Sequence, residues 1–170
     1  MLTDLRERLA RFGLTLHDDK TRLIEFGKLS TERRRQRGVG RPATFAFLGF
    51  THYCAQSREG RFVVKRRTDR RRLTRKLHAV RDELRRRMHS PLPLQHAWLC
   101  SVLRGHYRYY ALPSNWHALN AFCAEVRRSW FRALRRRSQR RLTWDRFNQW
   151  SERFPLPRAR ILHTRVALAV

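Results

Sequence analysis

Apolar positions repeat with helical spacing near the start of the chain and again after its first third. Leu2, Leu5, Leu9 and Phe12 lie three or four residues apart, so we predict a short amphipathic helix over residues 3–12. Beyond this helix the spacing of apolar residues shortens. The first part of the chain therefore combines one helix with shorter elements.

Short strands and turns are expected between the two helical regions. We predict strands at residues 14–16 and 21–26. Residues 29–42 carry like charges and two glycines, so we predict a mobile loop that orders only on a polyanion. The aromatic run 44–53 and the run 61–65 are separated by a turn, and they predict an antiparallel hairpin.

The second part of the chain predicts about four helices. Their apolar stripes are Leu73, Leu77, Val80, Leu84 and Met88; Leu94, Trp98, Val102 and Tyr109; Leu119, Phe122, Val126, Trp130 and Leu134; and Trp144, Phe147 and Trp150. Thr143 is the expected cap of the fourth helix. The predicted fold class is α+β, with a small antiparallel β part followed by an all-α bundle.

The charge of the chain is strongly positive and unevenly distributed. The 170 residues include 40 Lys and Arg against 13 Asp and Glu, which gives a formal charge of +27. Residues 1–30, 31–90 and 91–170 carry net charges of +1, +14 and +12. Because most of the cations are arginines, nucleic acid is the first candidate partner, ahead of an anionic membrane surface and of a basic surface kept for solubility.

Neither a membrane span nor a disulfide framework is expected. The chain has no run of even ten apolar residues and no secretory signal, so we interpret it as cytoplasmic. Cys54, Cys100 and Cys123 are odd in number and widely spaced, which predicts buried thiols.

Residues suited to catalysis are scarce. Asp18 and Asp19 are adjacent carboxylates outside the predicted helices, and we favour a solvated turn over a metal site for them. His96 and Cys100 share a helix face, and a packed pair is favoured over zinc ligation. We therefore predict no metal site and interpret the chain as a binding protein.

One stretch, residues 104–110, interleaves arginine with aromatic residues, a pattern typical of contacts to phosphate and unpaired bases. Tyr107, Tyr109 and Tyr110 cannot all face one core, so some of them should line a polar surface. Gly105 costs about 1 kcal/mol relative to Ala within a helix, which indicates close approach by another backbone, of protein or of RNA.

Four stretches in order, residues 13–27, 45–52, 103–110 and 135–144, carry a resemblance to a known family, and Arg160-Ile-Leu-His163 extends it. The second reads Phe-Ala-Phe-Leu-Gly-Phe-Thr-His. Over about residues 3–163 the chain resembles the C-terminal part of bacterial group II intron reverse transcriptases, also called maturases.

The resemblance implies that residues 1–65 are the end of a polymerase palm, with a helical maturase-specific thumb at 66–163 and a tail at 164–170 that matches no family pattern. The family's catalytic Tyr-Ala-Asp-Asp stretch is absent, and Lys20 matches a lysine thought to protonate pyrophosphate. We therefore expect no activity from this chain alone, with Mg²⁺ needed only in a complete polymerase. Residues 14–65 should be marginally stable unless an upstream palm and fingers polypeptide docks there.

The leading hypothesis is an RNA-binding fragment that holds group II intron RNA or template-primer. Two alternatives remain: one part of a split RNA-directed DNA polymerase, active only with an upstream fragment, and a truncated product without a role. The candidate RNA-binding residues are Arg70, Arg71, Arg75, Arg104, Arg108, Arg127, Arg128, Arg135, Arg136, Arg137, Tyr107 and Tyr110.

Overall fold

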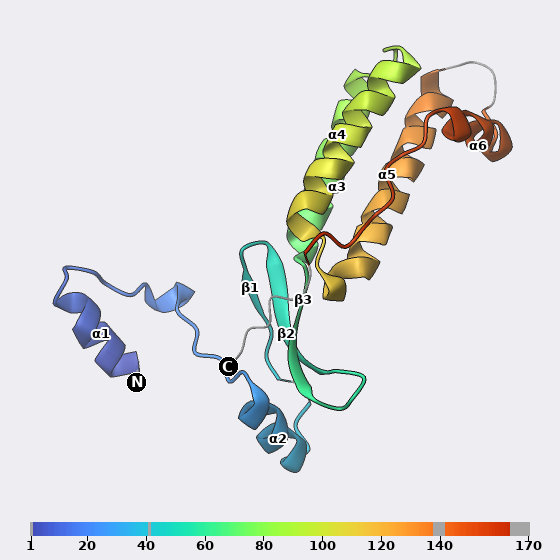
Figure 1. Ribbon diagram of the computed structural model, residues 1–170. Helices are drawn as coiled ribbons and strands as arrows, with labels where there is room; N and C mark the ends of the chain where they lie inside the picture. The colour runs from blue at the N-terminus through green and yellow to red at the C-terminus, as the bar shows by residue number, and fades with distance from the viewer. Residues whose placement is uncertain (1, 41, 138–141, 164–170) are drawn as a thin grey trace. The chain divides into compact units, whose positions relative to one another are not determined.

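The fold is of the α+β class, as the sequence predicts, and the described residues form a three-stranded antiparallel sheet and six α-helices. The computed structural model describes residues 2–40, 42–137 and 142–163 (Figure 1). Its elements are α1 (Leu2–Ala10), a 3₁₀ turn (Asp18–Lys20), α2 (Lys28–Gln36), β1 (Phe45–Phe47), β2 (Phe50–Gln56), β3 (Phe62–Thr68), α3 (Arg70–Arg86), α4 (Leu92–Tyr110), a second 3₁₀ turn (Pro113–Asn115), α5 (Trp116–Arg137) and α6 (Trp144–Arg153).

The chain divides into two compact units. Unit 1 comprises Met1–Phe45 and Tyr53–Val64, and unit 2 comprises Ala46–His52 and Lys65–Val170. Each unit contains parts of the sheet strands. Every buried hydrophobic side chain in the described part of the chain belongs to unit 2.

Unit 1 confirms the first predicted helix and corrects two other predictions. Residues 14–16 and 21–26 belong to no strand, because an extended segment needs a hydrogen-bonded neighbour and the described residues provide none for them. Helix α2 forms over residues 28–36, and all of it after Lys28 lies within the predicted loop. The arginines and Gln36 are good helix formers, and Thr31 hydrogen bonds Gly27 O through both its amide (3.1 Å) and its hydroxyl (3.0 Å), so the first turn forms despite the like charges.

The sheet follows the order β1-β2-β3, which confirms the predicted hairpin of β2 and β3. Between β1 and β2 the chain turns at Leu48 and Gly49, which both have positive φ angles, of 47° and 80°. A Cβ added at Gly49 would lie 2.8 Å from the hydroxyl oxygen of Tyr110. Glycine is therefore required at this turn for both its conformation and its size.

Helices α3, α4 and α5 form the body of unit 2 and lie side by side in Figure 1. Their buried residues include most of the stripes predicted for α3 and α5. The stripe predicted for α4 is wrong, because Leu94 and Tyr109 are exposed and the neighbouring helix face, which carries Leu99, Leu103 and Tyr107, packs into the core. Leu77, Val80 and Leu84 are buried on α3, and all five predicted core residues of α5 are buried. Thr143 caps α6 as predicted, because its side chain accepts a hydrogen bond from Arg146 N.

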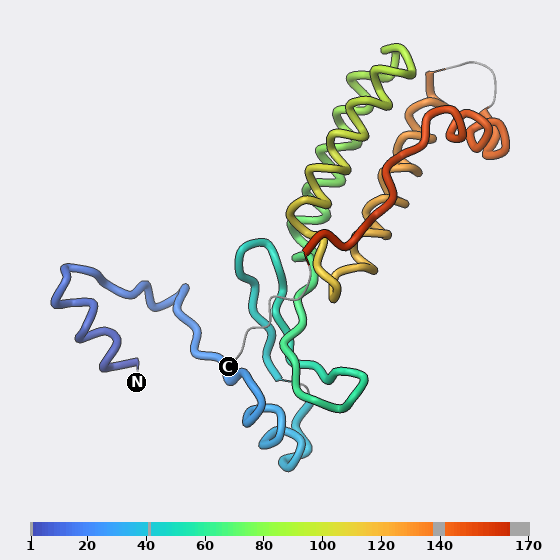
Figure 2. Tube along the Cα trace, in the orientation of Figure 1, coloured from blue at the N-terminus to red at the C-terminus, as the bar shows by residue number. Residues whose placement is uncertain are grey.

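The segment that follows α6 returns along the bundle, as the tube in Figure 2 shows. The Tyr107 hydroxyl donates to Pro157 O at 3.1 Å, and the amides of Leu162 and His163 both donate to Ala111 O at 3.2 Å. The hydrogen bonds place the end of the described chain beside the C-terminal end of α4. The predicted tail, 164–170, lies outside the described residues.

Two buried amide side chains connect the elements of unit 2. Gln95 Nε2 donates to the carbonyls of Arg87, Met88 and Ser90 at the end of α3, while its Oε1 accepts from Trp130 Nε1 of α5 at 3.0 Å. In a separate contact, Asn115 Oδ1 accepts from the amide of Thr68 at 2.8 Å. These bonds satisfy backbone groups at helix and strand ends, which would otherwise be buried without partners.

No helix in the described ranges has both the length and the apolar character that crossing a bilayer requires.

Candidate nucleic-acid interface

A cationic pocket of about 400 Å³ lies where the C-terminal half of α5 meets the start of α6. It is lined by five residues of α5, which recur at intervals of three, four, seven and eight and so share one helix face, and by one residue of α6. The lining residues are Arg128, Phe131, Arg132, Arg135, Arg136 and Trp144. Four arginines and two aromatic residues thus line one pocket.

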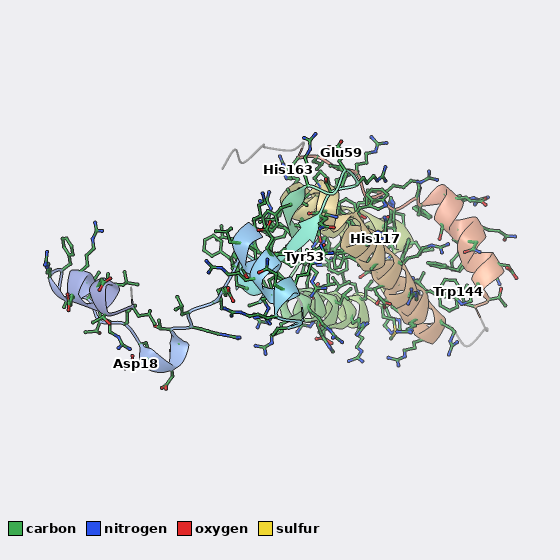
Figure 3. The ribbon with its side chains drawn as sticks, turned by 90° about the horizontal axis from the view of Figure 1, so that it is seen from below. Asp18, Tyr53, Glu59, His117, Trp144 and His163 are labelled. Atoms are coloured by element: carbon green, nitrogen blue, oxygen red, sulfur yellow. The ribbon has the colours of Figure 1, made fainter. Side chains whose placement is uncertain are left out.

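Trp144 is the accessible aromatic ring of this pocket. Figure 3 shows it at the start of α6. Its ring stacks on Phe131 with centroids 3.9 Å apart and an interplanar angle of 16°, and it is 43% exposed. The Thr143 cap fixes the backbone that precedes it. Packing on a buried Phe131 orients a large flat surface that remains accessible to solvent.

The pocket has no acidic lining residue. Glu125, one turn before it on α5, forms ion pairs with Arg128 and, at 3.5 Å, with Arg81. No ion pair joins Arg132, Arg135 or Arg136 to an acidic residue within the ranges that the structure describes. The positive charge of this helix face is therefore largely uncompensated, which favours an anionic ligand.

The structure brings only some of the predicted binding residues together. Arg128, Arg135 and Arg136 line the pocket. Arg127 lies beside it and donates to Asn148 Oδ1 at 2.6 Å, and Arg137 donates to Ser90 O at 3.1 Å.

The other predicted arginines lie away from this pocket. Arg70 and Arg71 are exposed on α3, and Arg104 and Arg108 are exposed on α4. Arg75 lines a second concave surface, between α3 and α4, to which Tyr110 also contributes. The predicted set thus covers several faces of unit 2.

The predicted role of Tyr107 in stacking on an RNA base is wrong. It is only 4% exposed, and its hydroxyl is bonded to Pro157 O. Burial raises the pKa of this phenol far above its usual range. Because helix α4 directs Tyr107 into the core, its ring is not available to a base, whereas Tyr109 is half exposed.

Beyond its own helix, Gly105 has no close neighbour among the described residues. A Cβ added there would meet no atom within 4 Å in the described structure. The prediction that another protein backbone approaches Gly105 is therefore wrong, and only approach from outside the chain stays open.

Lys20 and the two neighbouring aspartates lie in the exposed 3₁₀ turn of unit 1. Asp18 pairs with Arg6. This confirms a solvated turn. Within the described residues, no three His, Cys, Asp or Glu side chains gather where they could hold a metal ion.

The predicted packed pair of His96 and Cys100 is confirmed, with 3.2 Å between His96 Nε2 and Cys100 Sγ. Burial raises the pKa of the Cys100 thiol, although Arg104 opposes the shift. Of the other two cysteines, Cys54 and Cys123 are only partly buried, so the prediction of buried thiols holds fully for Cys100 alone.

Five residues that line the two concave surfaces are not among those predicted from the sequence. They are Arg132, Trp144, Arg72, Lys76 and His106. Arg132 shares a helix face with Arg128, Arg135 and Arg136, and this spacing is a signal that could have predicted it. Trp144 was assigned to the core because of its spacing with Phe147 and Trp150. Exposure of its ring depends on how α6 meets α5, which local spacing does not encode.

Comparison of the chain with protein-family models, with curated proteins and with solved structures finds no match.

Proposed function

We propose that this chain binds structured RNA and is the RNA-binding C-terminal part of a group II intron reverse transcriptase or maturase. One observation carries the binding proposal: four arginines and the exposed ring of Trp144 line one pocket where α5 meets α6. Guanidinium groups bind phosphate oxygens in pairs, and an exposed indole stacks on an unpaired base. A folded RNA offers both groups at its loops and bulges.

The four motifs that resemble the maturase family support the choice of RNA. On that basis the bound RNA is group II intron RNA or template-primer, the compartment is the cytoplasm, and an upstream palm and fingers polypeptide is the protein partner. The arginines outside the pocket would contact the phosphates of a larger RNA, because α3, α4 and α5 all present exposed guanidinium groups.

Salt dependence tests the phosphate contacts. With six to ten contacts, affinity for a group II intron transcript should fall by about 10³–10⁵ between 50 and 200 mM salt. The measurement is fluorescence anisotropy of labelled RNA titrated with the full chain. A flat salt dependence would contradict the proposal.

A charge-matched comparison tests the pocket itself. Replacing Arg132, Arg135 and Arg136 with Gln should lower the slope of log affinity against log salt by about 2. The control replaces three exposed arginines of unit 1, Arg8, Arg11 and Arg22, with Gln, and should change the slope less. Equal effects of the two triple variants would show that net charge, rather than this pocket, determines binding.

The ring is tested separately from the charge. Trp144→Ala should weaken binding to a transcript with unpaired loops by about 5- to 150-fold, the range for loss of one stacked base. Trp144→Phe should retain most of the affinity. Circular dichroism checks that both variants keep the helical content of the parent.

A second candidate role, as one part of a split RNA-directed DNA polymerase, is favoured by unit 1. Its apolar side chains at Phe12, Leu14, Leu23 and Leu29 are exposed in this chain. Burial of these side chains against an upstream palm would stabilise the unit. Primer extension by the mixed fragments is the test, and no activity from fragments that associate would contradict it.

A further inference from the structure

A second groove, separate from the pocket that contains Trp144, lies between α3 and α4. Its volume is about 760 Å³, within the range of about 300–1,000 Å³ typical of small-molecule sites. All of its lining residues belong to unit 2. The groove therefore lies wholly within unit 2.

Three cations of α3 line one side of the groove: Arg72, Arg75 and Lys76. They lie within five residues of each other on consecutive turns, and no acidic residue lines the groove. Such a cluster fits a phosphate group better than a single negative charge, because several donors can contact its oxygens.

The other side of the groove is formed by α4 and contains the buried ring of His106. This ring packs between Phe122, with centroids 3.9 Å apart, and Tyr110, at 4.6 Å. Its Nε2 atom has no hydrogen-bond partner among the described residues. A buried polar atom without a partner is unfavourable, and a hydrogen bond to a ligand would remove that penalty.

His106 is held in its neutral form. Burial lowers its pKa to about 4, and the nearby charge of Lys76 contributes to the same shift. A neutral imidazole nitrogen can accept or donate a hydrogen bond depending on its tautomer. This matches the edge of a nucleobase, which presents both kinds of group.

Gly105 lines the α4 side of the groove. It lies in the middle of α4, where glycine is less favourable than alanine, and an added Cβ would meet nothing within 4 Å in the described structure beyond its own helix. Packing within the chain therefore gives no reason for glycine here. Space for a ligand against the helix backbone is a sufficient reason.

We propose that the groove between α3 and α4 binds one nucleotide, with its phosphate on Arg72, Arg75 and Lys76 and its base against Gly105 and His106. The nucleotide has two possible sources, a free nucleotide and an unpaired residue of a bound RNA. Phosphate and base chemistry are common to both. The site adds to the proposed RNA binding but can be tested without RNA.

The first measurement is a titration of the full chain with each ribonucleoside 5′-monophosphate, followed by NMR. We expect saturable shifts of the Gly105 amide and the His106 side chain, and weaker binding of both inorganic phosphate and unphosphorylated nucleosides. Shifts absent from these two residues at millimolar nucleotide would overturn the proposal. Inorganic phosphate that binds as tightly as the monophosphates would also overturn it.

The matched variants are Gly105→Leu, which fills the groove, and Ala121→Leu, which places the same side chain at an exposed position on α5. Leucine favours the helix at position 105, so this variant should fold. We expect Gly105→Leu to weaken nucleotide binding by about tenfold or more, equivalent to about 1.4 kcal/mol, and Ala121→Leu to leave it unchanged. Equal affinities in the two folded variants would overturn the proposal.

The same variants identify the source of the nucleotide. If Gly105→Leu weakens both nucleotide and RNA binding, the groove takes an unpaired residue of the RNA. If only nucleotide binding is lost, the groove takes a free nucleotide. Both outcomes support the site, and the effect of Trp144→Ala on RNA affinity tests the α5–α6 interface independently.

Discussion

His106 illustrates, at the scale of one residue, what sequence reasoning could and could not predict. Its position in an arginine- and aromatic-rich stretch of α4 was evident, and a role for that stretch was predicted. Its burial against Phe122 was not, because residues 16 positions apart meet only when α4 and α5 pack. The unpaired nitrogen follows from that packing, and the lowered pKa of His106 follows first from its burial and then from the charge of Lys76.

Burial of His106 predicts a pH dependence of stability. The free imidazole titrates near 6.5, whereas the pKa in the folded chain is about 4. Above pH 6.5 the His106 imidazole is neutral in both the folded and the unfolded chain, so its contribution to stability is fully present. As the pH falls from 6.5 to 4, the unfolded chain takes up a proton that the folded chain does not, so stability should fall by about 3 kcal/mol.

Urea denaturation of the parent and of His106→Phe between pH 7 and 4 measures this effect. Phenylalanine retains the stacking but does not titrate, so the variant should lose less stability on acidification. Lys76, Arg72 and Arg75 face the groove in both proteins, and their contribution cancels in the comparison. Parallel pH profiles would contradict the prediction.

At the scale of elements, the long helices were predictable and the short segments were not. Helices α3, α4 and α5 each repeat apolar residues over several turns, so one face of each is specified many times. Residues 21–26 match a strand pattern as well as the long helices match a helical one. They form a strand, however, only if another strand pairs with them. Helix α2 formed because local propensity outweighed like-charge repulsion.

Gln95 determines how three of these elements join. It is fully buried, and its amide meets the end of α3, the turn before α4, and Trp130 of α5. Gln95→Leu should leave three carbonyls and the Trp130 N–H with fewer partners. We therefore expect a loss of about 3 kcal/mol or more in the free energy of unfolding.

Denaturant titration at neutral pH measures the change. The matched control is Gln149→Leu, an exposed position on α6, which should alter stability by less than about 0.5 kcal/mol. If the two variants are equally stable, the amide does not hold the helix junction together.

At the scale of the whole molecule, stability is unevenly distributed between the two units. Helix α1 has no buried residue, and α2 has only Ser30. Unit 2 contains the entire buried apolar cluster of the described chain. The apolar helical stripes in the second part of the chain predict this contrast. That residues 46–52 belong to unit 2 depends on contacts that local sequence patterns do not specify.

Hydrogen exchange should reveal this contrast. Amides in residues 14–45 should exchange through low-energy local opening, whereas those of α3, α4 and α5 should require opening of the packed bundle. Mass spectrometry of the exchanged full chain resolves the two groups. Similar protection in both would contradict the assignment of marginal stability to unit 1.

The apolar side chains of unit 1 also affect how the protein behaves in concentrated solution. Phe12, at 75% exposed, and Leu14, Leu23 and Leu29 face water in the isolated chain. Their mutual attraction grows with protein concentration, while the cationic surface opposes it until salt screens the charge. Aggregation and chaperone binding should therefore begin at the first 30 residues. A solution that repulsion between arginines keeps clear at low salt should become turbid as salt is added.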